Sequence, residues 1–241
     1  MALRPGTEAR LTLTTHHILG GLRRRAPRRP VWLGSLGRPR PISEQWGYDR
    51  GTPVDRWYIE RFLALHRADI TGRVLEVKDS GYTDRFGSEL SERGVLDIDA
   101  GNSAATYVAD LAAAETIPGD RFDCFVLTQT LQYMYDVGAA LTHVHRILRP
   151  GGVVLATLPV VSRVSGPPAT DYWRFTEQAA RKLFGEAFAG GTVETWPRGN
   201  VLSQVAFLEG LAAEELDDDR LDPDDPRFPL VICVRASKAG A

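Results

Sequence analysis

From residue 70 onward, short apolar runs alternate with segments of helical periodicity. The runs expected to be strands are 73–77, 94–99, 106–111, 122–127, 153–159, 192–196 and 229–236, and the expected helices are 53–66, 138–148, 176–188 and 201–216. Near-continuous apolar strands separated by helices are typical of a mostly parallel sheet that is covered on both faces. Because such sheets bind ligands beyond the carboxyl ends of their strands, the residues that follow each strand are the candidates for function.

Several helix boundaries carry recognisable signals. Thr52-Pro53 predicts a helix with proline at its first position, and its apolar stripe is Val54, Tyr58, Phe62 and Leu65. Pro150-Gly151-Gly152 predicts the end of the helix over 138–148, and Thr176 is expected to cap the helix that follows it.

Bulk properties exclude several classes of protein. The chain has 241 residues and a net charge of −2, which fits one large α/β domain and argues against a general polyanion binder. Its two cysteines, Cys124 and Cys233, lie in apolar runs, so we expect no disulfide framework and no zinc site, and a reducing cytoplasm fits best. We expect neither a signal peptide nor a membrane helix, since no apolar run approaches about 20 residues.

The charges are unevenly distributed. Residues 1–40 hold nine arginines and one acid, whereas residues 209–225 hold nine acids and one arginine. We interpret 1–40 as a basic, partly disordered extension rather than a nucleic-acid arm, because no aromatics are interleaved before Trp32. The acids lack the spacing of a calcium loop and are expected to be solvated, with no metal bound. The catalytic domain is predicted over 41–241, with a helical insertion at about 199–228.

Acidic residues follow the first predicted strands in an informative order. An acid about 20 residues after the first strand–helix turn suits a ribose, because one carboxylate can accept hydrogen bonds from both hydroxyls. Asp97 lies 21 residues after Glu76. Asp110, after the third strand, could accept a hydrogen bond from an adenine amino group.

These motifs resemble, in order, those of class I S-adenosylmethionine-dependent methyltransferases, in the type 11 branch that acts on small molecules. The resemblance covers roughly residues 70–198 and rests on VLEV, VLDID, YVADL, FDCFVLTQTLQYMYD and HRILRPGGVVLATLP. Its most specific piece is the PGG turn before the fifth strand. The flanks WGYDRGTPVDRWYIERFL and DYWRFTEQAARKLF resemble a bacterial subgroup of these enzymes. The resemblance implies a Rossmann-like, mostly parallel seven-stranded sheet with helices on both faces.

The same resemblance implies S-adenosylmethionine as cofactor and assigns roles at the strand ends. Asp97 would hold the ribose, Asp110 and Leu111 the adenine, and Glu76 would support the first loop. The whole implied cofactor set is Glu76, Lys78, Ser80, Gly81, Tyr82, Asp97, Asp99, Asp110, Leu111, Thr128 and Gln129.

The sequence departs from the family in two places. The first loop has Lys78, Ser80 and Tyr82 where the family has alternate glycines, which let the backbone approach the ligand. Gln132-Tyr133 replaces a usual Glu-His pair. The loop is therefore either remodelled around the cofactor or closed to it. We favour the first interpretation, with Lys78 on the cofactor's carboxylate and Ser80 or Tyr82 on its amino group.

Candidates for the acceptor side lie on the two flanks. The histidines lie away from the strand ends, so the predicted catalytic residues are Asp171, Tyr172 and Arg174. The predicted substrate contacts are Tyr48, Arg50, Tyr58 and Trp173. Two structural alternatives stay open: a hydrophobic staple of Tyr172-Trp173 before Thr176, and a loop clasp between Asp171 and Arg174.

The sequence thus predicts a biosynthetic transferase that methylates a hydroxyl, or an amine, of a sugar-like or secondary-metabolite substrate, either a small molecule or a glycan. The alternative is a protein of the same fold with a degenerate cofactor loop and a binding role or other chemistry. A nicotinamide dehydrogenase is disfavoured, since GxGxxG is absent. We do not expect nucleic acid as a partner. The helix in the insertion could wall the substrate pocket or form a homodimer face.

Overall fold

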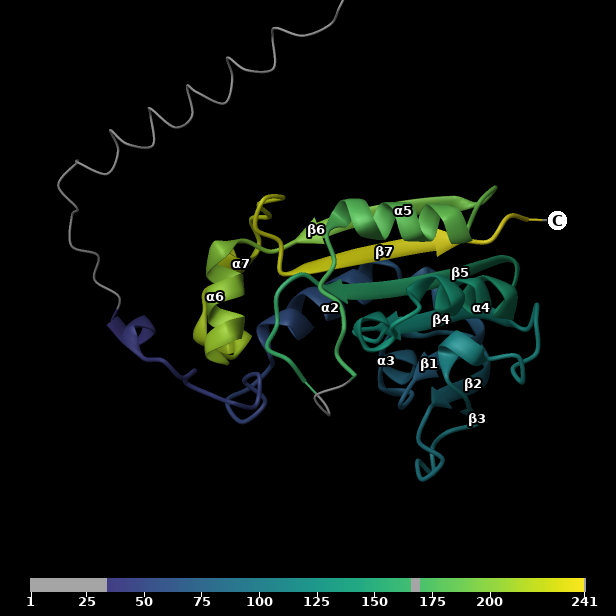
Figure 1. The fold of residues 1–241 in the computed structure, drawn as a ribbon, viewed down its shortest axis with the longest axis horizontal. Coiled ribbons are helices and arrows are strands. Elements are labelled where there is room, and N and C mark those ends of the chain that lie inside the picture. Colours follow the sequence, from purple (N-terminus) through teal and green to yellow (C-terminus); the bar gives the residue numbers. More distant parts are fainter. Residues whose placement is uncertain (1–33, 166–169, 241) are drawn as a thin grey trace, which may run out of the picture. The chain divides into compact units, whose positions relative to one another are not determined.

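The computed structural model describes residues 34–165 and 170–240. The chain divides into two units, Met1–Pro39 and Arg40–Ala241. The described part of the first unit contains one short 3-10 helix, η1 (Gly34–Gly37). The predicted disorder of the basic extension falls mostly on residues 1–33, which lie outside the described residues. The second unit holds the sheet and every element discussed below (Figure 1).

One seven-stranded sheet organises the second unit. Its spatial order is β3-β2-β1-β4-β5-β7-β6, and β7 runs antiparallel to both of its neighbours while the other pairs are parallel. The strands are β1 (Gly72–Val77), β2 (Leu90–Asp97), β3 (Tyr107–Val108), β4 (Phe122–Thr128), β5 (Leu148–Pro159), β6 (Thr192–Arg198) and β7 (Val231–Ser237). This arrangement confirms the predicted mostly parallel Rossmann-like sheet.

Helices cover both faces of the sheet. They are α2 (Val54–Leu65), α3 (Gly81–Phe86), α4 (Val137–Ile147), α5 (Glu177–Ala187), α6 (Val201–Glu209) and α7 (Asp218–Leu221), with short 3-10 turns η2 (Arg67–Asp69), η3 (Leu111–Ala113), η4 (Leu131–Tyr133) and η5 (Ala213–Glu215). Helices α4 and α5 pack on one face, and α2, α3 and α6 pack on the other (Figure 1).

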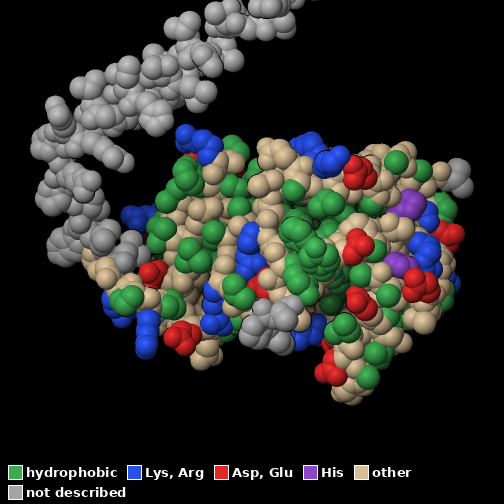
Figure 2. All heavy atoms as spheres, viewed as in Figure 1, with side chains coloured by type: hydrophobic (Ala, Val, Ile, Leu, Met, Phe, Trp, Pro, Cys, Tyr) green, Lys and Arg blue, Asp and Glu red, His purple; other side chains and the backbone are tan. Residues whose placement is uncertain are grey.

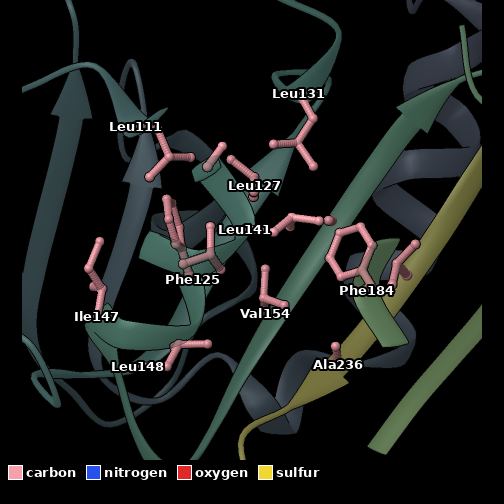
Figure 3. Packing of buried hydrophobic residues seen from close by; sticks show 14 of the residues in the cluster. Leu111, Phe125, Leu127, Leu131, Leu141, Ile147, Leu148, Val154, Phe184 and Ala236 are labelled. Atoms are coloured by element: carbon pink, nitrogen blue, oxygen red, sulfur yellow. The ribbon is translucent and has the colours of Figure 1, made fainter. Parts of the chain in front are cut away.

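Strand β4 shows why the sheet sequences are almost wholly apolar. Phe125 and Leu127 point into the core under α4 and α5, whereas Cys124 and Val126 point into the opposite core. Figure 3 shows Phe125 and Leu127 beside Leu141 of α4. Since both faces are buried, neither can be polar. Burial also raises the pKa of the Cys124 thiol, so this cysteine is a packing residue.

The first long helix differs in detail from its prediction. It begins at Val54, and Pro53 occupies the N-cap with no side-chain capping bond from Thr52. Its buried stripe runs through Val54, Tyr58, Ile59, Phe62 and Leu63, whereas Leu65 is exposed. The prediction of Leu65 as a core residue was therefore wrong. At 3.6 residues per turn, positions 59 and 63 lie on the same face of the helix as 58 and 62. Leu65 is the last residue of the helix and lies outside this buried face.

Two other boundaries also differ. Helix α4 passes directly into β5 at Leu148, so Pro150-Gly151-Gly152 lies within the strand, where the pairing with β4 shifts register. The helix predicted over 201–216 ends at Glu209, because Gly210 adopts a left-handed C-cap with φ of 70°. The prediction for Thr176 is confirmed: its side chain accepts a hydrogen bond from Ala179 N–H.

The acidic segment after α6 is ordered and paired. Asp222 contacts Arg61 at 2.8 Å, Asp224 contacts Arg198 at 2.7 Å, and Glu215 pairs with Arg50. Within the described ranges no group of three or more histidine, cysteine or acidic residues could hold a metal ion. These ion pairs join the segment to Arg61 of α2 and Arg198 of β6, while most of its acids are exposed to solvent, as expected.

His66, at the end of α2, makes stability depend on pH. Its ring packs at a tilt against Phe62 and Trp196, and Asp69, Glu194, Arg235 and Arg198 surround it. Burial lowers the pKa of His66 below its usual value, with Asp69 opposing this shift. The unfolded chain then binds the proton first as pH falls below about 6.5, so stability decreases there. Between pH 7.5 and 5.5, denaturant unfolding should show a smaller decrease in the free energy of unfolding for His66→Gln than for wild type. An equal decrease in the two proteins would contradict this.

Candidate cofactor and acceptor site

Strand register brings the predicted cofactor residues to one edge of the sheet. Val77 pairs with Leu96 across β1 and β2, Asp97 pairs with Val108 across β2 and β3, and Glu76 pairs with Val126 across β1 and β4. All four strands run in the same direction and end within a few residues of these pairs. The segments that follow them therefore meet at the carboxyl edge, where open α/β sheets bind ligands.

Asn102 joins the first two of these segments. Its side-chain amide donates to the Lys78 carbonyl at 2.7 Å and to Asp97 Oδ2 at 2.7 Å. The other Asp97 oxygen accepts from the Asp99 N–H at 3.0 Å. One side chain thus fixes both the loop after β1 and the rotamer of the acid after β2. Asn102 was not among the residues predicted from the sequence, because nothing in the sequence indicates that its loop folds back on Asp97.

Asp97 is held in its charged form. Partial burial raises its pKa, but hydrogen bonds from Asp99 N–H and the Asn102 amide, together with the charge of Lys78, outweigh this and hold the pKa below its usual value. A carboxylate offers two lone pairs on each oxygen, so each oxygen that already accepts one bond can accept another. Asp97 is therefore ready to receive two hydroxyl groups.

The loop after β1 has unusual backbone geometry for its sequence. Lys78 has φ of 77° and Gln129, just after β4, has φ of 46°. Non-glycine residues seldom adopt such values, and they gather at functional sites, where surrounding contacts hold them. The Lys78 side chain is exposed, and in the described ranges its ammonium makes no hydrogen bond or ion pair.

Glu76 fixes the other end of this loop. Its buried carboxylate accepts from Tyr82 N–H at 3.1 Å and Thr83 N–H at 2.7 Å, the first free N–H groups of α3. Burial raises the pKa of Glu76, and the bonds from Thr83 and Tyr82 oppose that rise. This placement allows Glu76 to hold the loop, and its supporting role toward the cofactor stays a prediction.

Ser80 and Tyr82, two of the three residues that stand in place of glycines, do not fill the carboxyl edge of the sheet. Tyr82 packs in the core beneath α2, and its phenol oxygen accepts from Arg56 at 2.7 Å. Ser80 donates to Asp84 Oδ2 at 2.8 Å. Tyr82 is thus held partly buried against the core, and Ser80 is engaged with Asp84 at the surface. Gly81 N–H is bound by Asp79 Oδ1 at 2.8 Å. This geometry favours a loop that is remodelled and open over one that is closed.

Among the remaining cofactor candidates, Leu111 differs from the others because its side chain is buried in the core. Asp110 is exposed, and its Oδ1 caps η3 by accepting from Ala112 N–H at 2.9 Å. Leu111 is 2 % exposed and belongs to the core shown in Figure 3. Leu111 can therefore contribute its backbone, but its side chain is occupied by packing. Thr128 and Gln129 lie at the end of β4, beside Thr157 of β5.

Two buried amides after β4 lack partners. Gln132 donates from Nε2 to the Gln129 carbonyl at 2.8 Å, but Gln132 Oε1 and Gln129 Nε2 are buried without a hydrogen-bond partner in the described structure. Such groups cost free energy and are rare in native proteins. An unmet donor and acceptor at the carboxyl edge are what a polar ligand would satisfy.

Asp171 and Arg174 form the clasp that the sequence analysis left as an alternative to catalysis. Arg174 donates to Asp171 Oδ2 at 2.9 Å and to the Arg163 carbonyl at 2.9 Å, while Ser165 N–H also donates to Asp171. The Arg174 guanidinium lowers the pKa of Asp171. These bonds use both carboxylate oxygens, which favours a role in fastening the segment after β5.

Exposed aromatic rings gather beside the clasp. Tyr135 lies 5.4 Å from Tyr172 and 6.1 Å from Trp173 between ring centroids, and Trp173 donates from its indole to the Met134 carbonyl. Tyr135 is 74 % exposed. Figure 2 shows hydrophobic side chains gathered where the segment after β4 lies in Figure 1. Tyr133 and Tyr135 were not among the predicted site residues, and their exposure became evident only in the structure.

The predicted contacts on the first flank lie in different environments. Tyr48 is exposed and its hydroxyl accepts from Arg56 at 3.0 Å. Arg50 binds Glu215, with Nε 2.9 Å from Oε2. Tyr58 is 3 % exposed, and its hydroxyl donates to the Leu221 carbonyl at 2.7 Å. This burial gives Tyr58 a packing role.

Comparisons with known proteins agree with this geometry. Residues 69–156 match a family described as "Methyltransferase domain". The uncharacterized protein YafE of Escherichia coli (strain K12) is 39 % identical over 70 residues, a match covering 28 % of this chain and 32 % of YafE. The match thus spans about a third of that relative.

Several solved structures share the fold. A methyltransferase in complex with the Haloferax volcanii Trm112 activator gives a TM-score of 0.52 at 18 % identity, covering 78 % of this chain and 92 % of that one. An S-adenosylmethionine-dependent methyltransferase from Mesorhizobium loti gives 0.51 at 18 % identity, covering 80 % and 100 %. The cyclase SpnF gives 0.52 at 18 % identity, covering 84 % and 87 %.

The chain therefore has the fold of class I S-adenosylmethionine-dependent methyltransferases, and its residues 69–156 match the methyltransferase-domain family. The edge residues fit S-adenosylmethionine: Asp97 has free lone pairs for ribose hydroxyls, the Lys78 ammonium is available, and Tyr82 is turned away. Separately, no helix in the described ranges is long and apolar enough to cross a membrane.

The backbone of Lys78 gives a direct stability test. A left-handed φ costs a non-glycine residue roughly 1 kcal/mol, and glycine avoids this cost. Lys78→Gly should therefore raise the free energy of unfolding by roughly 1 kcal/mol, whereas Lys78→Ala, which keeps a Cβ, should not. Urea denaturation of the two variants measures the difference. Equal stability of Lys78→Gly and Lys78→Ala would contradict the backbone geometry described for this loop.

Proposed function

We propose that this protein is a methyltransferase that transfers the methyl group of S-adenosylmethionine to a hydroxyl, or to an amine, of a small acceptor. The observation that carries the proposal is the junction at which Asn102 fixes a charged Asp97 beside the open loop of Lys78. The cofactor supplies an activated methyl group. The protein's own task is to hold that group and the acceptor in line and to exclude water.

The edge residues divide the cofactor among them in this proposal. Asp97 accepts from the two ribose hydroxyls, and the free oxygen of Asp110 accepts from the adenine amino group. The exposed Ile98, 73 % accessible beside Asp97, offers an apolar surface for the base. Lys78 pairs with the carboxylate of the methionine part. Gln129 and Gln132 supply the polar groups that lack partners within the protein.

The aromatic group after β4 and β5 is the proposed rim of the acceptor site. Trp173, Tyr172 and Tyr135 expose ring faces that can pack on a sugar or another ring, or face a cation. The Tyr172 hydroxyl is the candidate to position an acceptor hydroxyl, while Asp171 and Arg174 keep the segment in place. This rim supports a sugar-like or secondary-metabolite substrate and a biosynthetic role. The buried, unpaired cysteines support a cytoplasmic location.

Titration calorimetry with S-adenosylhomocysteine tests the proposal. The wild type should bind, and Asp97→Asn should bind about tenfold or more weakly, because hydrogen bonds to a charged carboxylate contribute about 1.5–3 kcal/mol. Asp120→Asn is the matched control, since Asp120 precedes β4 and pairs with Lys238 at 2.6 Å at the opposite edge. Absence of binding by the wild type, or equal binding by Asp97→Asn, would refute the proposal.

The role of the Lys78 ammonium has its own test. Lys78→Ala should weaken S-adenosylhomocysteine binding about tenfold by removing one charge-assisted contact. Decarboxylated S-adenosylhomocysteine, which lacks the carboxylate, should bind wild type and Lys78→Ala equally. An equal loss of affinity for both ligands in Lys78→Ala would show that Lys78 supports the structure of the loop instead of binding the carboxylate.

A second function is favoured by one observation, the lack of alternate glycines after β1. The same fold occurs in the cyclase SpnF, so a non-methylating role is the alternative. Methylation of any acceptor by the purified protein, with consumption of the cofactor, would reject it.

A further inference from the structure

A hollow lies beyond the residues proposed to bind the cofactor. It has a volume of about 260 Å³ and lies between the segment before α2, the segment after β5 and helix α6. Its walls include Pro41, Glu44, Trp46, Arg163, Phe207 and Leu208. None of these residues was assigned a role from the sequence. The residues proposed to bind the cofactor therefore do not account for this hollow.

Strand direction places this hollow on the functional side of the sheet. Strands β5 and β6 each run antiparallel to β7, so they run parallel to each other. Arg163 follows the carboxyl end of β5, and two residues separate the end of β6 from the start of α6. The hollow thus lies beyond the carboxyl ends of strands, at the same edge as Asp97 and Gln129.

The walls of the hollow are preformed. Ile42 and Ser43 donate their N–H groups to the Glu209 carbonyl at 2.9 and 3.0 Å, which fastens the segment before α2 to the end of α6. On the other side, the Arg163 carbonyl accepts from Arg174 of the clasp at 2.9 Å. Both segments are therefore held by hydrogen bonds without any ligand.

Arg163 is the charged group of the hollow. Its guanidinium carbon lies 3.4 Å from the centre of the Trp46 ring, and in the described ranges it forms no ion pair. A guanidinium stacked on an aromatic face keeps its edge N–H groups free, and these match the geometry of a carboxylate or phosphate. Phe207 and Leu208 give the hollow an apolar wall. Leu208 is 47 % exposed, so part of that wall faces outward.

We propose that this hollow is a further part of the acceptor site, beyond the aromatic rim, and that it binds an acceptor that is an organic anion with an apolar or aromatic body. The anionic group lies on Arg163 and the body packs on Phe207 and Leu208. This inference rests on the proposed methyl transfer, which requires an acceptor at this edge. It also gives α6 a function, as a wall of the acceptor site. Glu44 lies at the same hollow and repels the anion, so its removal strengthens binding.

Calorimetry with paired probes tests this proposal. The probes are 4-hydroxyphenylacetate and octanoate, each compared with its uncharged amide. Each acid should bind the wild type more tightly than its amide, and Arg163→Gln should remove most of that preference, about tenfold for one charge-assisted contact. Glu44→Gln should tighten the acids only. Arg181→Gln, on α5 and paired with Glu177, is the control and should behave as wild type. Unchanged melting temperatures would show that the variants are folded.

The outcomes separate this proposal from the proposed function. If neither acid binds more tightly than its amide, or if Arg163→Gln keeps the preference, the anion site is refuted even when S-adenosylhomocysteine binds normally. If the acids bind through Arg163 but S-adenosylhomocysteine does not bind, the hollow stands and the methyl-transfer proposal fails. A change of oligomeric state in Leu208→Glu without acid binding would assign the hollow to a contact between two copies.

Discussion

The register of β1, β2 and β4 is the constraint on which the site depends. Leu75 and Leu96 fill one core and Val74 and Val126 the other, so each strand can pair in only one way without exposing apolar side chains. A shift of one residue would turn every side chain to the opposite face. The same register places Glu76, Asp97 and Gln129 at one edge. Hydrophobic packing therefore fixes the spacing of the polar groups that are proposed to bind the cofactor.

At this edge the chain forms the proposed cofactor loop without the alternate glycines expected there from the resemblance. Glycine would let the backbone turn without strain and leave room for the ligand. Here Lys78 adopts a left-handed φ, and Asn102 braces its carbonyl. Tyr82 leaves the edge for the core under α2, where Arg56 binds its phenol. Side-chain hydrogen bonds and burial thus replace the conformational freedom of glycine.

The sheet and the acids at its edge were predictable because they follow from local patterns. Apolar runs in the sequence identify the strands. In a parallel sheet, the order of Glu76, Asp97 and Asp110 along the chain then shows which strand end carries each acid. Helix ends were less predictable: Gly210 stops α6 through its own backbone conformation, while the apolar pattern continues past it. The stacking of Arg163 on Trp46 joins residues distant in sequence, so no local pattern predicts it. The pairing of Asp171 with Arg174 was foreseen as an alternative to a catalytic role, but the sequence did not decide between the two because the choice depends on how the loop folds.

A crystal structure with S-adenosylhomocysteine tests the central claim most directly. The account predicts the ribose hydroxyls within hydrogen-bonding distance of both Asp97 oxygens, with Asn102 still bridging Asp97 and the Lys78 carbonyl. It also predicts the homocysteine carboxylate beside the Lys78 ammonium. A complex in which the ligand binds elsewhere, or crystals in which Lys78 and Gln129 fill the edge at saturating ligand, would contradict it.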